Sequence, residues 1–101
     1  MATVVFTPAA EREVDDLHAW ISQRAGERIA DAFVERIVSY CLGFSTFPER
    51  GRKRDDLLPG LRTIGFERRV TIAFVIDGDL VSIEGVFYGG RDFERKTSVN
   101  E

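Results

Sequence analysis

A stretch of alternating side chains that runs into a tight turn limits the possible folds more than any other feature of the chain. Residues 70–76 alternate between large apolar side chains and smaller ones, as in a β-strand that buries one face. Asp77-Gly78 follows directly and favours a two-residue hairpin turn into a second strand, Leu80 to Tyr88. Leu61 to Phe66 is a further strand candidate, because it follows the turn sequence Pro59-Gly60. The C-terminal half therefore predicts a three-stranded antiparallel sheet.

The N-terminal half predicts one short strand followed by a helix. Thr3 to Phe6 is short and apolar enough to form the strand. Thr7-Pro8 then favours a helix start, with threonine as the N-cap and proline at the first helical position, where its missing N–H group costs nothing. The helix is expected to end near Arg24. Its apolar face is marked by residues at helical spacing: Ala10, Val14, Leu17 and Ile21.

A second helix is expected after a short break at Ala25-Gly26, where glycine can take the left-handed conformation that often ends a helix. This helix is expected from Glu27 to Ser45, and Phe47-Pro48 ends it. A connection this short makes the two helices antiparallel. The apolar residues expected on the inner face of the second helix are Ile29, Phe33, Ile37, Cys41 and Phe44.

The order of these elements predicts the fold class. We expect one α+β domain over residues 1–101, with a strand, an antiparallel helical hairpin and then a three-stranded antiparallel sheet. The helical hairpin should cover one face of the sheet, because each helix has a single apolar face that must be buried.

Strict alternation along the last strand would divide its side chains between two faces. Val81, Ile83 and Phe87 are expected on the face of the principal core. Tyr88 belongs to the opposite set, so we expect it to stand apart from that core.

Composition argues against several classes of protein. The sequence is 44% hydrophobic and 31% charged, with a mean hydropathy of -0.14, which is typical of a globular protein rather than a disordered or membrane-embedded one. A net charge of -3 argues against nucleic-acid binding through the overall field, and no direct sequence-specific DNA binding is expected. The first residues lack the pattern of a signal peptide, so a cytoplasmic location is expected.

Metal, cofactor and disulfide sites are not expected. Cys41 is the single cysteine, and its place on a helical apolar face favours a buried small side chain. His18 has no second histidine or nearby cysteine with which to form a zinc site. No glycine-rich phosphate loop or Ser-His-Asp pattern stands out.

Basic side chains concentrate in the second half of the chain. Residues 49–101 carry ten basic and ten acidic groups, against four and seven in residues 1–48. Four cations within residues 50–54 could contact phosphates. A solvated patch is the favoured interpretation, because Asp55 and Asp56 partly cancel their charge.

Three arginines and a tyrosine form the most interesting constellation, namely Arg62, Arg69, Tyr88 and Arg91. Adjacent antiparallel strands could bring them to one face or one end of the sheet. Clustered guanidinium groups can stabilise the charge that develops during RNA cleavage. They can equally bind acidic side chains of a protein partner or pair with acids of the same chain, and the residues alone leave these alternatives open.

Trp20 lies at the edge of the first helix's apolar face, about 60° around the helix from Leu17. One interpretation is ordinary core periphery. The other is an anchor for a protein partner, since aromatic side chains are favoured at the centres of interfaces.

Several short motifs occur in an order that resembles the RelE/ParE superfamily of toxins from type II toxin-antitoxin systems, with the ParE branch most similar. Each motif is short, but together they extend from residue 16 to residue 92. The order strand, helix, helix and three strands is also that of the superfamily. The motifs are Asp16-Leu17, Phe47-Pro48-Glu49-Arg50-Gly51, Pro59-Gly60-Leu61-Arg62, Arg68-Arg69-Val70 and Tyr88-Gly89-Gly90-Arg91-Asp92.

The resemblance to ParE implies a toxin that inhibits DNA gyrase by binding, without catalysis, cofactor or metal. It also implies a cognate ParD-like antitoxin of the ribbon-helix-helix type, which neutralises the toxin in a hetero-oligomer. The gyrase contacts expected from this resemblance are Arg69, Tyr88, Arg91 and Asp92. The antitoxin contacts expected from it are Leu17, Trp20, Arg62 and Arg69.

The alternative is a RelE-like endoribonuclease that cleaves messenger RNA on the ribosome. In that branch basic side chains and a C-terminal tyrosine carry the chemistry, so the catalytic candidates here would be Arg62, Arg69, Tyr88 and Arg91. The segment after Asp92 contains Phe93 and no tyrosine. We therefore favour the ParE interpretation.

Overall fold

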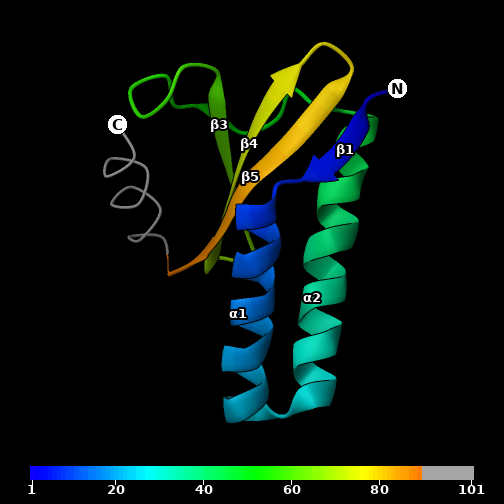
Figure 1. Ribbon diagram of the computed structural model, residues 1–101, viewed down its shortest axis with the longest axis vertical. Helices are drawn as coiled ribbons and strands as arrows, with labels where there is room; N and C mark the ends of the chain where they lie inside the picture. Colours follow the sequence, from blue (N-terminus) through cyan, green and yellow to red (C-terminus); the bar gives the residue numbers. More distant parts are fainter. Residues whose placement is uncertain (90–101) are drawn as a thin grey trace.

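The computed structural model describes residues 1–89 and shows two antiparallel helices packed over one face of a five-stranded sheet (Figure 1). The predicted order of strand, helical hairpin and three antiparallel strands is confirmed. The elements are β1 (Thr3–Phe6), α1 (Pro8–Ala25), α2 (Glu27–Leu42), a short 3-10 helix (Gly43–Ser45), β2 (Arg52–Lys53), β3 (Leu61–Phe66), β4 (Val70–Asp77) and β5 (Leu80–Tyr88).

The helix boundaries follow the predicted start and stop signals. The Thr7 side chain accepts a hydrogen bond of 3.1 Å from the Ala10 N–H group, as an N-cap should. Gly26, with φ of 97°, separates α1 from α2. The second helix ends three residues earlier than expected, because Gly43 begins the 3-10 helix. Just beyond the 3-10 helix, the Arg50 guanidinium donates a hydrogen bond of 2.7 Å to the carbonyl oxygen of Phe47.

The strand order is β1-β5-β4-β3-β2, in which β1 runs parallel to β5 and all other neighbours are antiparallel. Pairing of β1 stops at Phe6, opposite Ile83, because the chain then turns into α1. Among the described residues, no strand therefore covers the outer edge of β5 beyond Ile83. The opposite edge of the sheet is β2, which sequence analysis did not predict, since two charged residues give no periodic signal.

The principal core lies between the sheet and the helical hairpin. Phe44 and Phe74 are fully buried there, and their ring centroids are 4.7 Å apart. The expected inner face of α2 was wrong at one position, since Ile29 is 55% exposed while Ala30 is buried. The hairpin extends past the sheet toward the α1–α2 connection, so the residues at that end have less to pack against (Figure 1). A second, smaller apolar cluster contains Leu61, Ala73 and Phe87.

An extra residue in β5 exchanges the two faces for the residues that follow it. Ala73 pairs with Gly85 and Phe74 pairs with Ile83, which leaves Glu84 as a β-bulge. A one-residue insertion moves every later side chain to the other face. Tyr88 consequently packs against the principal core and Phe87 joins the second cluster. The predictions that Phe87 faces the principal core and that Tyr88 stands apart from it are therefore wrong.

Gly51 is expected to resist substitution, because it combines a φ of 74° with a close approach to β3. A Cβ atom at this position would lie 2.3 Å from the carbonyl oxygen of Thr63, which is backbone and cannot rotate away. We expect Gly51→Ala to lower the free energy of unfolding by about 2 kcal/mol, measured by urea denaturation. Gly65→Ala is the matched control, since a Cβ atom there meets open space. Equal stability of the two variants would contradict this geometry.

Cys41 is expected to be chemically inert in the folded protein. Its side chain is fully buried, and burial raises the pKa of the thiol to about 12. Iodoacetamide at pH 8 should leave the native protein unmodified and alkylate it once urea is added, as measured by mass spectrometry. The folded pKa lies above the value of about 8.5 for an exposed cysteine, so this thiol should cost no stability below that pH and should destabilise the fold as the pH rises toward 12. Rapid alkylation of the native protein would show that the helical hairpin opens.

The described residues contain neither a membrane span nor a metal cluster. No helix within residues 1–89 is long and apolar enough to cross a bilayer. Over the same residues, no three His, Cys, Asp or Glu side chains gather in a way that could hold a metal ion. His18 instead contacts Asp31 at 2.6 Å between Nε2 and Oδ1, which links α1 to α2.

Candidate functional site

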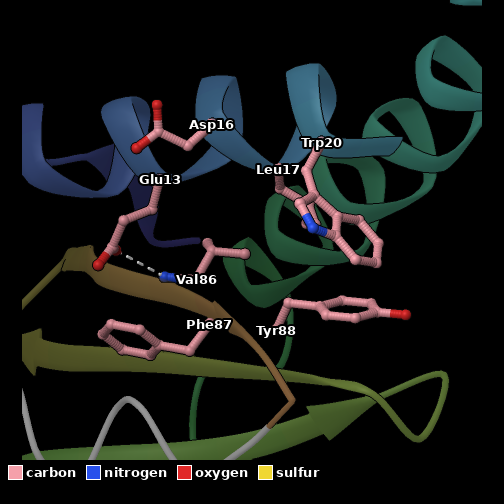
Figure 2. Close-up of a pocket in the computed structure, with 7 residues that line it drawn as sticks. All are labelled: Glu13, Asp16, Leu17, Trp20, Val86, Phe87 and Tyr88. Atoms are coloured by element: carbon pink, nitrogen blue, oxygen red, sulfur yellow. Dashed lines mark hydrogen bonds between the residues drawn. The ribbon is translucent and has the colours of Figure 1, made fainter. Parts of the chain in front are cut away.

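A groove between α1 and the edge of β5 beyond the end of β1 is the candidate site (Figure 2). It has a volume of about 300 Å³ and opens to solvent. The term "α1–β5 groove" is used below for this surface. It is lined by Glu13, Asp16, Leu17, Trp20, Val86, Phe87 and Tyr88.

The floor of the groove is the bulged end of β5, which α1 supports through a side chain. The Val86 N–H group donates a hydrogen bond of 3.0 Å to Glu13 Oε1, which is drawn as a dashed line in Figure 2. This amide lies beyond the end of β1, where no strand covers the edge among the described residues. A buried N–H group without a partner is costly, so the Glu13 carboxylate stabilises this part of the edge. It also fixes the position of α1 over β5.

The aromatic pair Trp20 and Tyr88 forms one end of the groove. Their ring centroids are 5.1 Å apart with a tilt of 44°, and Figure 2 shows Trp20 on α1 above Tyr88 on β5. The guanidinium carbon of Arg24 lies 4.1 Å from the Trp20 ring centroid, a cation–π contact. Trp20 nevertheless remains 41% exposed. An aromatic side chain held in place from two sides yet open to solvent can contact a partner at low entropic cost.

A second hollow lies on the other side of the aromatic pair, so Trp20 and Tyr88 separate two concave surfaces. This hollow has a volume of about 240 Å³. Beyond the aromatic pair it is lined by Ile21, Arg24, Ala25, Ile29, Phe33 and Arg36.

One ion pair holds the β3–β4 turn against α2 beside the second hollow. Arg36 Nε and Nη2 donate to the two carboxylate oxygens of Glu67 at 2.8 and 3.1 Å. These hydrogen bonds lower the pKa of Glu67 and raise the pKa of Arg36. Glu67 and Arg68 both have positive φ values, of 47° and 68°, and the ion pair anchors this unusual turn.

The predicted arginine constellation does not come together around one point. Arg69 and Tyr88 lie at the same end of the sheet, where the Gly89 N–H group donates to the Arg69 carbonyl oxygen at 2.7 Å. Arg62 pairs with Phe74, which lies five residues after Arg69, so the two arginines are about 17 Å apart along β4. Arg62 Nη1 instead donates to the Arg50 carbonyl oxygen at 3.2 Å. Arg91 and Asp92 lie outside the described residues.

Two of the four basic side chains in residues 50–54 make contacts within the chain. Arg54 donates two hydrogen bonds of 3.0 Å to the carboxylate of Asp56. These bonds lower the pKa of Asp56. Arg50 binds the end of the helical hairpin, as described above. Arg52 and Lys53 are exposed on the edge strand β2, where charged side chains discourage pairing with another sheet.

The groove therefore combines three of the predicted site residues with four that sequence reasoning missed. Leu17, Trp20 and Tyr88 are brought together, whereas Arg62 is remote. The missed residues are Glu13, Asp16, Val86 and Phe87. One sequence signal could have found part of this set, because Glu13 lies one helical turn before Leu17 on the same side of α1.

Comparisons with known proteins identify the family of the chain. The family model described as "ParE toxin of type II toxin-antitoxin system, parDE" matches residues 4–93. Toxin ParE3 of Caulobacter vibrioides is 36% identical over 63 residues, a match that spans 62% of this chain and 63% of that protein. A solved structure of a chromosomal ParDE TA system from P. aeruginosa has a TM-score of 0.76 at 22% identity, and the match covers 87% of this chain and 96% of that one, which shows a common fold. Because the family model covers residues 4–93, the chain belongs to the ParE toxin family of type II toxin-antitoxin systems.

Proposed function

We propose that this protein is a toxin that inhibits DNA gyrase by binding and that a cognate antitoxin neutralises it by occupying the α1–β5 groove. The observation that carries the neutralisation step is the half-exposed Trp20 ring, which is held against Tyr88 at one end of that groove. Membership of the ParE family supports the assignment as a toxin.

The partner we propose is a ParD-like antitoxin of the ribbon-helix-helix type in a hetero-oligomer with this chain. The similar structure from P. aeruginosa is that of a ParDE system, and its fold corresponds to this one at a TM-score of 0.76. A wrapping segment of such a partner would contact Leu17, Trp20 and Tyr88, which line the groove from both sides. Toxin and antitoxin would meet in the cytoplasm.

A binding mechanism fits the arrangement of charged groups better than catalysis does. RNA cleavage by an arginine cluster needs Arg62 and Arg69 within reach of one phosphate. Their backbones are about 17 Å apart along β4, and Arg62 binds a backbone carbonyl, which supports binding over catalysis. We propose that Arg69 and Tyr88, together with Arg91 and Asp92 of the following segment, contact gyrase.

Controlled expression in a bacterial host tests the assignment as an antitoxin-regulated toxin. Expression of this chain alone should arrest growth, and co-expression of the ribbon-helix-helix protein encoded beside its gene should restore it. The partner and the toxin should also co-purify as one complex at a defined stoichiometry. Normal growth on expression of the folded chain alone would contradict the proposal, and circular dichroism of the purified protein establishes that the chain is folded.

A further inference from the structure

We propose that the α1–β5 groove and the adjoining second hollow together select an extended partner segment in which a basic, an apolar and an acidic side chain occupy alternate positions. This inference rests on one part of the proposed function, namely that a protein partner binds in the groove. It adds the chemistry of the partner's side chains. It also names the two side chains of this chain that recognise them, Asp16 and Arg24.

Asp16, Trp20 and Arg24 form an oblique row along α1 because they are four residues apart. Each step of four residues advances about 6 Å along the helix axis and turns about 40° around it, so the row presents an acid, an aromatic ring and a base about 6 Å apart along the axis. Asp16 lies on the rim of the first hollow and Arg24 lines the second, on either side of the Trp20–Tyr88 pair. Figure 2 shows the first half of this row, from Asp16 to Trp20, above β5.

The charges at the two ends of the row are available to a partner. Within residues 1–89 the ion pairs join His18 to Asp31, Arg36 to Glu67 and Arg54 to Asp56, so neither Asp16 nor Arg24 is in one. Arg24 is held over the Trp20 ring and makes one long hydrogen bond, of 3.4 Å, to the Trp20 carbonyl oxygen. Two opposite charges flanking an apolar contact favour a partner whose charges are arranged in the complementary order.

The spacing of the row suits an extended partner segment. The two hollows, of about 300 and 240 Å³, each admit a few side chains. Alternate residues of an extended chain are about 6.7 Å apart and lie on the same side. This spacing matches the row on α1, so the partner would present a cation to Asp16, an apolar side chain to Trp20 and an anion to Arg24.

Synthetic peptides test this order of charges without a known antitoxin. The first probe is the acetylated, amidated peptide Gly-Lys-Thr-Leu-Thr-Glu-Gly, and the second replaces its lysine with glutamate. The sequence contains a single tryptophan, Trp20, so its fluorescence reports occupancy of the groove directly. Titrations of the folded full chain at low salt would give the dissociation constants of both peptides.

We expect the first peptide to bind the wild-type chain about fivefold more tightly than the second. In the Asp16→Lys variant this preference should reverse, because the cation of the first peptide would then meet a lysine. Asp15→Lys is the matched control, since it makes the same change of charge one position along the helix and outside both hollows. That variant should keep the wild-type preference.

Three results would overturn the inference: equal affinity of the two peptides for the wild-type chain, an unchanged preference in Asp16→Lys, or no binding of either peptide. Each of these outcomes leaves the proposed function standing if the chain still arrests growth and is rescued by its antitoxin. Conversely, failure of those growth experiments would contradict the proposed function, regardless of the peptide affinities.

Discussion

Replacing Phe74 with alanine is expected to lower the free energy of unfolding by about 4 kcal/mol, the typical cost of removing a phenylalanine from a core. Phe74 is fully buried at the centre of β4, and its ring packs against Phe44 at 4.7 Å. The change removes apolar contact with both layers and leaves a cavity that the surrounding side chains fill only partly. Because domains of this size are stable by only about 5–15 kcal/mol, the variant should be close to unfolding at 37 °C.

Urea denaturation followed by circular dichroism measures this effect. Phe47→Ala is the matched control, because it deletes the same side chain at a position that is 67% exposed. We expect that variant to change stability by about 0.5 kcal/mol or less. Similar losses in the two variants would show that the helices do not pack on the sheet as described.

Replacing Trp20 with alanine is expected to weaken antitoxin binding by about 3 kcal/mol, which is more than 100-fold in the dissociation constant. The same change should lower the free energy of unfolding by only about 1 kcal/mol. The difference arises because Trp20 is 41% exposed in the isolated chain and loses mainly its contact with Tyr88, whereas a partner in the groove would cover the whole ring. Isothermal titration calorimetry with the cognate antitoxin gives the first quantity and urea denaturation the second.

Leu42→Ala provides the control for this experiment. Leu42 is 50% exposed at the far end of α2 and lines neither hollow, so its removal should leave antitoxin affinity unchanged. A Trp20→Ala variant that loses as much stability as affinity would instead identify Trp20 as core periphery. In that case the antitoxin would have to bind elsewhere.

Sequence alone was sufficient for most of the secondary structure and for the fold class. Periodicity identified both helices and the three long strands, and the glycine at position 26 marked the turn between the helices. The strand β2 was missed because its two residues are both charged and its pairing with β3 depends on tertiary contact. Ile29 was misplaced because its size suggested burial, whereas the neighbouring Ala30 faces the core.

The candidate site was harder to predict because it depends on a single inserted residue. Period-two alternation places Tyr88 on the wrong face, and only the bulge at Glu84 turns it toward Trp20. A glycine inside a strand, here Gly85, is a known signal of a bulge, but it does not say which residue is inserted. Contacts between Glu13 and Val86 could not be foreseen either, because they join residues far apart in sequence.

The positions of the arginines show that residues on adjacent strands need not form one site. Arg62 lies near the start of β3 and Arg69 lies in the turn after its end, so antiparallel pairing carries them apart rather than together. The strand register separates Arg62, which supports the fold, from Arg69, which lies at the Tyr88 end of the sheet. This division is the main structural reason for favouring a binding mechanism over a ribonuclease.

The most direct test of gyrase inhibition adds the purified, antitoxin-free protein to DNA gyrase and follows supercoiling and trapped cleaved DNA. A ribosome-bound messenger-RNA cleavage assay is run alongside with the same preparation. We expect loss of supercoiling while the messenger stays intact. Fully active gyrase together with messenger cut at the ribosome would contradict this expectation.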